Sequence, residues 1–340
     1  MIETDLNRKS SWADPWELVL ASATDTRPPI DATLVRRLVD AQFPQWAELP
    51  LKLLEPAGSD HVIYRLGAEL SVRLPRHTGA IGQAKKEYEW LPRLAPHLPL
   101  AIPVPVGVGE PGYGYPWPWA VSRWLDGEVA TVETLASSSE AAVELAEFLT
   151  ALQRFAPGDI PAASAREDLT GRPLADRDRA TRAAIAQVGT TSGAAPGVVS
   201  GVASGATVDT ALGAVFDAEA MTELWDAALS VPGWDRPPVW FHGDFHTGNL
   251  LTADGRLSAV IDFGELGLGD PACDLTIAFT LMSAESRAAF RAALGVDDDT
   301  WTRGRGWALA TGLNAYTSYA ATNPWVAAQT TRQITEALIG

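Results

Sequence analysis

Three polar residues in the second half of the chain have types suited to acid–base and metal chemistry. Asp244 lies five residues before Asn249, and Asp262 follows Asn249 after a further thirteen. An amide oxygen and a carboxylate that converge suit Mg²⁺, a hard cation that accepts few protein oxygens and fills its other positions with water and phosphate. Asp244 is then left to orient or deprotonate an attacking hydroxyl.

The residues between Asn249 and Asp262 predict how these two side chains meet. Apolar runs lie on both sides of Asp254-Gly255, a pair that strongly favours a tight hairpin turn. Folding about that turn sets Asn249 roughly opposite Val260. Asn249 and Asp262 therefore emerge at the same end of the expected hairpin.

A second candidate cluster lies earlier in the chain. Arg73 projects from the non-aliphatic face of an expected strand, and Glu87 lies on the apolar face of the helix that follows. An unpaired carboxylate is costly to bury, so we expect Glu87 to pair with Arg73, the alternative being two separate surface charges. In the turn before the strand, the backbone N–H groups of Gly58 and Ser59 could approach a phosphate, although the same sequence is also a generic turn.

Acidic residues follow Asp262 and have two interpretations. Glu265 and Asp270 could face a cationic substrate. Alternatively, Asp270 and Asp274 form a local network that braces the preceding loop, since their spacing also fits capping of the next helix. Both interpretations are open at this point.

Two nearby histidines have the spacing of a zinc-binding helix. His242 and His246 are four residues apart, but Gly243 and Gly248 disfavour a helix there and no third ligand is evident. We therefore expect no zinc site, and we expect His242 to be a structural member of the loop.

Length, charge and cysteine content narrow the class of protein. A chain of 340 residues exceeds what one core usually supports, which favours two lobes. The net charge of −16 argues against a nucleic-acid partner and suits a small cationic substrate, or it serves solubility alone. The single cysteine, Cys273, excludes an internal disulfide. The apolar run 18–21 is too short for a signal core or a membrane span, so we expect a cytoplasmic protein without a membrane partner.

The apolar periodicity predicts an α+β fold with a small antiparallel sheet followed by a mainly helical part. We expect an extension over residues 1–29, a first lobe over 30–124 and a second lobe over 125–340, with a low-complexity insert at 188–212. The expected strands cover residues 51–55, 61–66, 69–74, 117–122 and 239–241. The expected helices cover residues 31–43, 82–91, 140–155, 287–294 and 325–338.

Several sequence blocks carry a family resemblance. They are GSDHVIYRLG, SVRLPR, KKEYEWLPRL, HGDFHTGNLL and AVIDFGELGLGDPACDL. These blocks resemble the aminoglycoside and macrolide phosphotransferases, within a larger group that includes choline and homoserine kinases. The resemblance runs from about Leu53 to Asp274, and the D-x-x-x-x-N and D-F-G spacings match a kinase catalytic loop and its metal-binding aspartate.

The resemblance implies a two-lobed protein-kinase-like fold with ATP or GTP as phosphate donor. It assigns Asp244 as catalytic base, Asn249 and Asp262 as Mg²⁺ ligands, and Arg73 with Glu87 as phosphate clamp. Protein kinases carry lysine where this chain has Arg73, and the two cations differ in geometry. The base of the nucleotide is expected against the backbone of one connecting segment, formed by Ser122, Arg123, Trp124 and Leu125.

The acceptor is not fixed by these features, because a fold does not determine a substrate. An aminoglycoside or similar antibiotic is the first hypothesis. The alternative acceptors are a macrolide or a small metabolite. A further alternative is that the protein is a nucleotide-binding regulator without turnover. The sequence leaves the oligomeric state open.

Overall fold

The computed structural model describes residues 29–54, 60–156, 169–191 and 216–340. The expected extension over residues 1–29 therefore lies outside the described residues except for its last position. The expected insert over residues 188–212 is described only as far as residue 191. Gly58 and Ser59 also lie outside the described residues.

The chain divides into two compact units. One unit contains the residues up to Glu89 together with Val104–Trp124, and the other contains Trp90–Pro103 together with Leu125–Gly340. The chain therefore passes between the units at the expected boundary near residue 124 and at two further points, between Glu89 and Trp90 and between Pro103 and Val104. Residues 90–103 belong to the second unit because Trp90 packs on Trp240 there, with ring centroids 4.9 Å apart.

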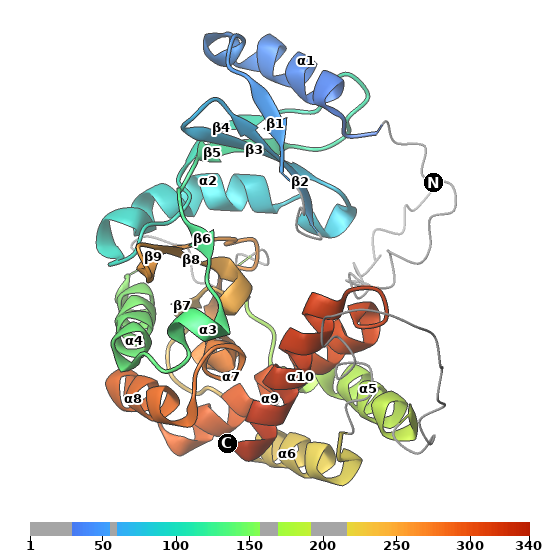
Figure 1. The fold of residues 1–340 in the computed structure, drawn as a ribbon, viewed down its shortest axis with the longest axis vertical. Helices are drawn as coiled ribbons and strands as arrows, with labels where there is room; N and C mark the ends of the chain where they lie inside the picture. Colours follow the sequence, from blue (N-terminus) through green and yellow to red (C-terminus); the bar gives the residue numbers. More distant parts are fainter. Residues whose placement is uncertain (1–28, 55–59, 157–168, 192–215) are drawn as a thin grey trace, which may run out of the picture. The chain divides into compact units, whose positions relative to one another are not determined.

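The first unit is built on a five-stranded antiparallel sheet in the order β1-β2-β3-β5-β4. The strands are β1 (Leu51–Leu53), β2 (His61–Leu66), β3 (Leu70–Pro75), β4 (Pro105–Gly109) and β5 (Trp119–Arg123). Helix α1 (Ala32–Gln42) begins after Asp31, which caps it by accepting a hydrogen bond of 2.8 Å from the Leu34 N–H. Helix α1 lies over the sheet in Figure 1. Its apolar side packs on the sheet, and Leu38 and Val39 are fully buried there.

Strand β4 was not predicted, and its glycines explain why. Residues 105–109 read as a Pro- and Gly-rich connection. In the structure a Cβ at Gly107 would lie 2.7 Å from the Phe43 ring, and a Cβ at Gly109 would lie 2.0 Å from Cε2 of Trp119. The glycines therefore let this edge strand approach aromatic rings closely, which propensity rules do not detect.

Helix α2 (Gln83–Leu94) corrects a second expectation. The expected helix ends at residue 91, whereas the observed helix contains Pro92 and continues to Leu94. Leu91 and Leu94 are fully buried. The packing of the last turn therefore outweighs the hydrogen bond that Pro92 cannot make.

The second unit is mainly helical and contains two small sheets. Its longer helices are α4 (Ser139–Arg154), α5 (Asp178–Thr191), α6 (Ala218–Ser230), α8 (Ala284–Leu294), α9 (Asp298–Tyr319) and α10 (Pro324–Ile339), with α3 (Val132–Leu135) and α7 (Ile277–Thr280) as short helices. Its strands are β6 (Glu128–Val129), β7 (Val239–Phe241), β8 (Leu250–Ala253), β9 (Arg256–Val260) and β10 (Gly267–Gly269). They pair in the orders β6-β8-β9 and β10-β7. The short 3₁₀ segments η6 (Thr247–Asn249) and η7 (Pro271–Thr276) complete the region around β7.

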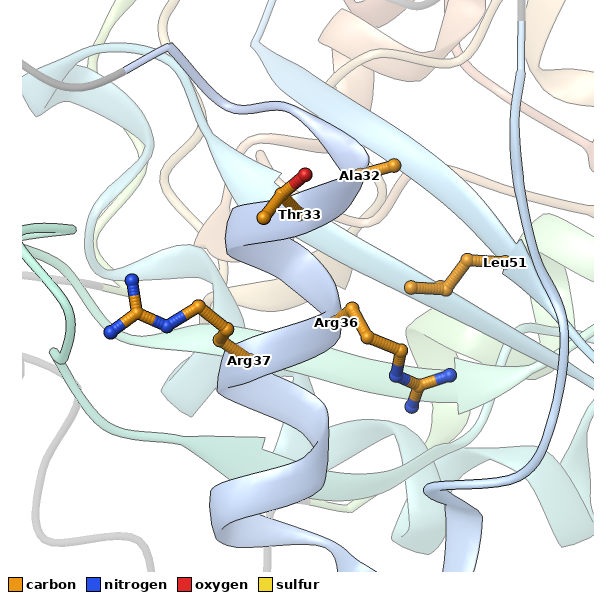
Figure 2. A pocket seen from close by; sticks show the side chains of 5 residues that line it. All are labelled: Ala32, Thr33, Arg36, Arg37 and Leu51. Atoms are coloured by element: carbon orange, nitrogen blue, oxygen red, sulfur yellow. The ribbon is translucent and has the colours of Figure 1, made fainter.

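A shallow hollow in the first unit lies beside α1 and does not coincide with any predicted site residue. Figure 2 shows its lining, Ala32, Thr33, Arg36, Arg37 and Leu51. Both arginines are held by the fold, since Arg36 pairs with Asp40 at 2.7 Å and Arg37 lies over the Tyr113 ring. No helix within the described ranges is both long enough and apolar enough to cross a membrane.

Substitution of Gly109 tests the edge-strand packing. Gly109→Ala should lower the free energy of unfolding by about 1–3 kcal/mol, because the new methyl group overlaps the buried Trp119 ring. The matched control is Gly82→Ala in the same unit, where a Cβ meets no atom within 4 Å. Urea denaturation followed by tryptophan fluorescence measures both variants. Equal midpoints would contradict this account of β4.

Candidate active site

The β8–β9 hairpin forms as expected around Asp254-Gly255, where both residues have positive φ. Its register differs from the simple count by one residue. Ser258 is an extra residue in β9, because the pairing shifts between Leu251 and Thr252. Asn249 therefore faces Ile261, whose N–H donates to the Asn249 carbonyl at 2.9 Å, and it does not face Val260.

The bulge brings Asn249 one residue closer to Asp262 than expected. Asp262 has φ +63°, which is uncommon for a residue other than glycine and is best tolerated by Asn and Asp. Backbone conformations of this kind are typical of functional sites, where the surrounding structure holds them in place. Asp262 is thus the residue directly after the partner of Asn249 at the end of the hairpin.

Asn249 and Asp244 are joined directly. The Asn249 Nδ2 group donates to the Asp244 carbonyl at 2.9 Å and to Asp244 Oδ2 at 3.1 Å. These bonds fix the orientation of the amide, so Asn249 Oδ1 points away from Asp244. An amide oxygen oriented in this way, together with the Asp262 carboxylate, is a donor set that fits Mg²⁺.

His246 contributes a second donor to the same carboxylate oxygen. Its Nε2 lies 3.4 Å from Asp244 Oδ2, and its Nδ1 accepts the Gly248 N–H at 3.0 Å. Because Nδ1 is an acceptor, the proton of the neutral ring is on Nε2 and points at Asp244. Both donors reach Oδ2, and Oδ1 of the half-exposed Asp244 is then free to accept from a bound hydroxyl.

The electrostatic environment keeps Asp244 ionised. Enclosure opposes its ionisation, but the imidazole of His246 and the hydrogen bonds from His246 and Asn249 hold the pKa of the carboxyl well below its ordinary value. An ionised carboxylate is the form that can accept a hydrogen bond or a proton from a hydroxyl.

His242 has the structural role that we expected. The ring is fully buried, its Nδ1 accepts the Asp244 N–H at 3.3 Å, and its Nε2 donates to the Ile261 carbonyl at 3.0 Å. Burial lowers the pKa of His242 to about 4, while the charges of Asp244 and Asp262 act in the opposite direction. The neutral ring therefore links the backbone at Asp244 to the backbone just before Asp262.

Asp274 holds the backbone that leads into this loop. Its carboxylate is fully buried and accepts the His242 N–H and the Gly243 N–H, each at 2.8 Å. Burial raises the pKa of Asp274 to about 7, and the two N–H donors oppose that rise. Gly243 has φ +88°, and a Cβ there would lie 2.4 Å from the Glu265 carbonyl oxygen, so glycine is required for this close approach.

The structural alternative for Asp270 is confirmed. Asp270 caps the Ala272 N–H at 3.0 Å, and Arg303 contacts both of its carboxylate oxygens at 2.7 and 3.2 Å. These contacts give no support to a substrate-binding role for Asp270. Glu265 is exposed at the surface, and its role toward a substrate stays a prediction.

The first unit contains the expected ion pair. Arg73 Nη1 lies 3.0 and 2.9 Å from the two carboxylate oxygens of Glu87, and both side chains are buried. In the expected nucleotide segment, the Arg123 N–H donates to Val104 and the Trp124 N–H donates to Glu69. A bound base would therefore have to use other backbone groups of Ser122–Leu125.

Sequence reasoning missed His246 as a member of this cluster. It considered the residue only as a zinc ligand and set it aside. The available signal was Gly248, where a Cβ would lie 2.8 Å from His246 Cε1. Gly248 has no side chain, and the space that a side chain would fill is occupied by the His246 imidazole.

Comparison with known proteins identifies the family of this chain. The model of the family described as "Phosphotransferase enzyme family" matches residues 52–307. The chain belongs to this family. No match is found among curated protein sequences. The expected family and two-lobed fold class are confirmed, and the protein is an enzyme that transfers phosphate to a hydroxyl group.

Solved structures share the fold of this phosphotransferase at low sequence identity. The GDP complex of wild-type aminoglycoside 2'-phosphotransferase-IIIa is 19% identical with a TM-score of 0.63, covering 90% of this chain and 98% of that chain. The gentamicin complex of APH(2")-IIa is 16% identical with a TM-score of 0.57, covering 92% and 97%. The apoenzyme of macrolide 2'-phosphotransferase MphH from Brachybacterium faecium is 21% identical with a TM-score of 0.55, covering 90% and 98%.

The buried pair of the first unit can be tested by a double-mutant cycle. Arg73→Ala and Glu87→Ala should each lower the free energy of unfolding by about 3 kcal/mol, because each leaves a buried charge without its partner. The double variant should cost far less than the sum. The exposed pair Arg172 and Asp176, 3.0 Å apart, is the control and should show a coupling below about 1 kcal/mol. Additive losses at Arg73 and Glu87 would argue against a coupled pair.

The contact between His246 and Asp244 gives a kinetic prediction. His246→Leu should lower kcat by about 10- to 100-fold with little change in the nucleotide KM, because the Asp244 carboxylate loses one of two groups that orient it. His246→Gln, whose amide N–H can reach the same oxygen, should recover most of that loss. The exposed His97→Leu serves as control. If the Gln and Leu variants are equally impaired, the donor to Asp244 is not what matters at this position.

Proposed function

We propose that this phosphotransferase moves the γ-phosphate of ATP or GTP onto a hydroxyl of an aminoglycoside or a similar antibiotic, in a Mg²⁺-dependent reaction. The observation that carries the proposal is the arrangement at Asp244. One oxygen of its carboxylate is held by Asn249 and His246, and the other can accept from a hydroxyl. A binding module that had lost turnover would have no need for such an oriented base, which argues against the regulator alternative.

Each residue of the cluster has a role in this proposal. Asp244 orients the acceptor hydroxyl and accepts its proton as the new phosphate ester forms. Asn249 and Asp262 hold Mg²⁺, which when bound neutralises charge on the donor phosphates. His242 and Asp274 keep the loop in place, so the reacting groups are positioned before the substrate arrives.

The ion pair of the first unit completes the proposal on the donor side. Arg73, held by Glu87, presents a guanidinium of fixed orientation that suits phosphate oxygens. Relatives with this fold include complexes described with GDP and with ATP, which is consistent with either nucleotide as donor. Because these nucleotides are found inside cells, a cytoplasmic location is part of the proposal.

The acidic balance of the chain favours a cationic acceptor. The net charge is −16, and the exposed Glu265 lies in the turn that contacts Gly243. Structures with this fold include one described with kanamycin and one with gentamicin. A macrolide 2'-phosphotransferase activity is the second candidate, favoured by the likeness to MphH. A role in antibiotic resistance would follow from either activity.

Two aspartate variants separate the proposed roles. Asp244→Ala should lower phosphoryl transfer by at least about 1,000-fold and leave nucleotide affinity within a few-fold, because the base contacts the acceptor and not the nucleotide. Asp262→Ala should lose Mg²⁺-dependent nucleotide binding as well as transfer. Titration calorimetry with ATP and GTP, with and without Mg²⁺, measures affinity, and mass spectrometry of the acceptor measures transfer.

The control for this experiment is Asp235→Ala, at an exposed position outside the cluster. Retained transfer in the Asp244 variant would remove that residue from the mechanism. Equal losses of nucleotide affinity in both variants would show that the division of roles is wrong.

A further inference from the structure

One tryptophan differs from the others in its surroundings. Within the described ranges, the tryptophans other than Trp325 are buried or partly buried. Trp325 is 59% exposed. A single exposed aromatic residue is ordinary on a protein surface, so exposure alone assigns no role.

The position of Trp325 is what gives its exposure a meaning. It is the second residue of α10, a helix that Asn323 caps by accepting the N–H groups of Trp325 and Val326. The ring edge, atom Cη2, lies 3.5 Å from the point where Gly248 would carry a Cβ. Trp325 therefore borders the loop between Asp244 and Asn249, on the side where the His246 ring lies.

The space between the His246 ring and the Trp325 ring depends on Gly248, which has no side chain. A Cβ at Gly248 would meet both the His246 ring, at 2.8 Å, and the Trp325 ring. Glycine at this position thus allows an exposed indole to stand against the catalytic loop. All of these residues belong to the second unit, so their arrangement is internal to one compact body.

The chemistry of this surface suits one kind of ligand. An exposed indole attracts an ammonium group through its π face and packs well against the flat side of a sugar ring. The loop that Trp325 borders also carries Asp244, whose carboxylate is half-exposed. An exposed aromatic ring beside a loop that carries an exposed carboxylate favours an amino sugar over a neutral alcohol.

We propose that Trp325 is a specificity-determining residue for the acceptor, forming a subsite on which an aminated sugar ring stacks while its hydroxyl reaches Asp244. This inference rests on the proposed function and adds the group that selects the acceptor. It requires nothing of the donor nucleotide, so the two sides of the reaction can be separated experimentally.

The test compares acceptor and donor kinetics in four proteins, namely wild type, Trp325→Ala, Trp325→Phe and Ile339→Ala. Kanamycin, gentamicin and streptomycin are the acceptors, with ATP or GTP as donor. Trp325→Ala should raise the acceptor KM about five- to tenfold and leave the donor KM within about twofold, because only the stacking face is lost. Trp325→Phe keeps an aromatic face and should stay within about threefold of wild type.

Ile339 is a matched control because it is an exposed apolar residue at the other end of the same helix. Ile339→Ala should leave both KM values within about twofold. Thermal unfolding of each variant verifies that the fold is intact. An unchanged acceptor KM in Trp325→Ala, or an equal rise in the donor KM, would overturn the subsite. If the wild type transfers phosphate to none of the amino-sugar acceptors, the proposed function itself fails, and the subsite fails with it.

Discussion

The buried carboxylate of Asp274 is the contact on which the rest of the candidate site depends. It accepts the two successive N–H groups of His242 and Gly243, and this fixes where the loop leaves strand β7. A buried carboxylate that satisfies two backbone donors is strongly held in place, since leaving either donor unpaired would be costly. From this anchor the His242 ring reaches both the Asp244 backbone and the Ile261 carbonyl. The loop and the hairpin are thereby locked to each other before any ligand is involved.

Local rules were sufficient for the parts of the site that are close in sequence. The Asp254-Gly255 turn predicted the hairpin, and burial of Glu87 on an apolar helix face predicted its pairing with Arg73. The one-residue bulge at Ser258 could not be predicted, because nothing in the strand pattern marks an extra residue. His246 was missed for a similar reason, since its contacts arise from the shape of an irregular loop and not from a periodic element.

The long helix α9 was not predicted from the apolar periodicity of the sequence. It contacts α5, α6, α10 and η7, so its buried residues lie on several sides and no single apolar face is present. Helix prediction by periodicity depends on one buried stripe and does not work for such a central helix. Strand β4 was missed because its glycines serve close packing against Phe43 and Trp119. Both omissions reflect tertiary packing that outweighs local propensity.

Because of the bulge in β9, the effect of an insertion or deletion on the hairpin register depends on its position. Extra residues at the tip, beyond Asp254-Gly255, would lengthen a surface turn and leave the base of the hairpin unchanged. Loss of Ser258 would remove the bulge and leave Asn249 opposite Ile261, because Leu250 and Leu251 would keep their partners. Loss of one residue from β8, such as Thr252, would instead set Asn249 opposite Val260, one position further from Asp262. Natural or engineered length variation is therefore tolerable at the turn and at the bulge, whereas a deletion of one residue within β8 would change the register between Asn249 and Asp262.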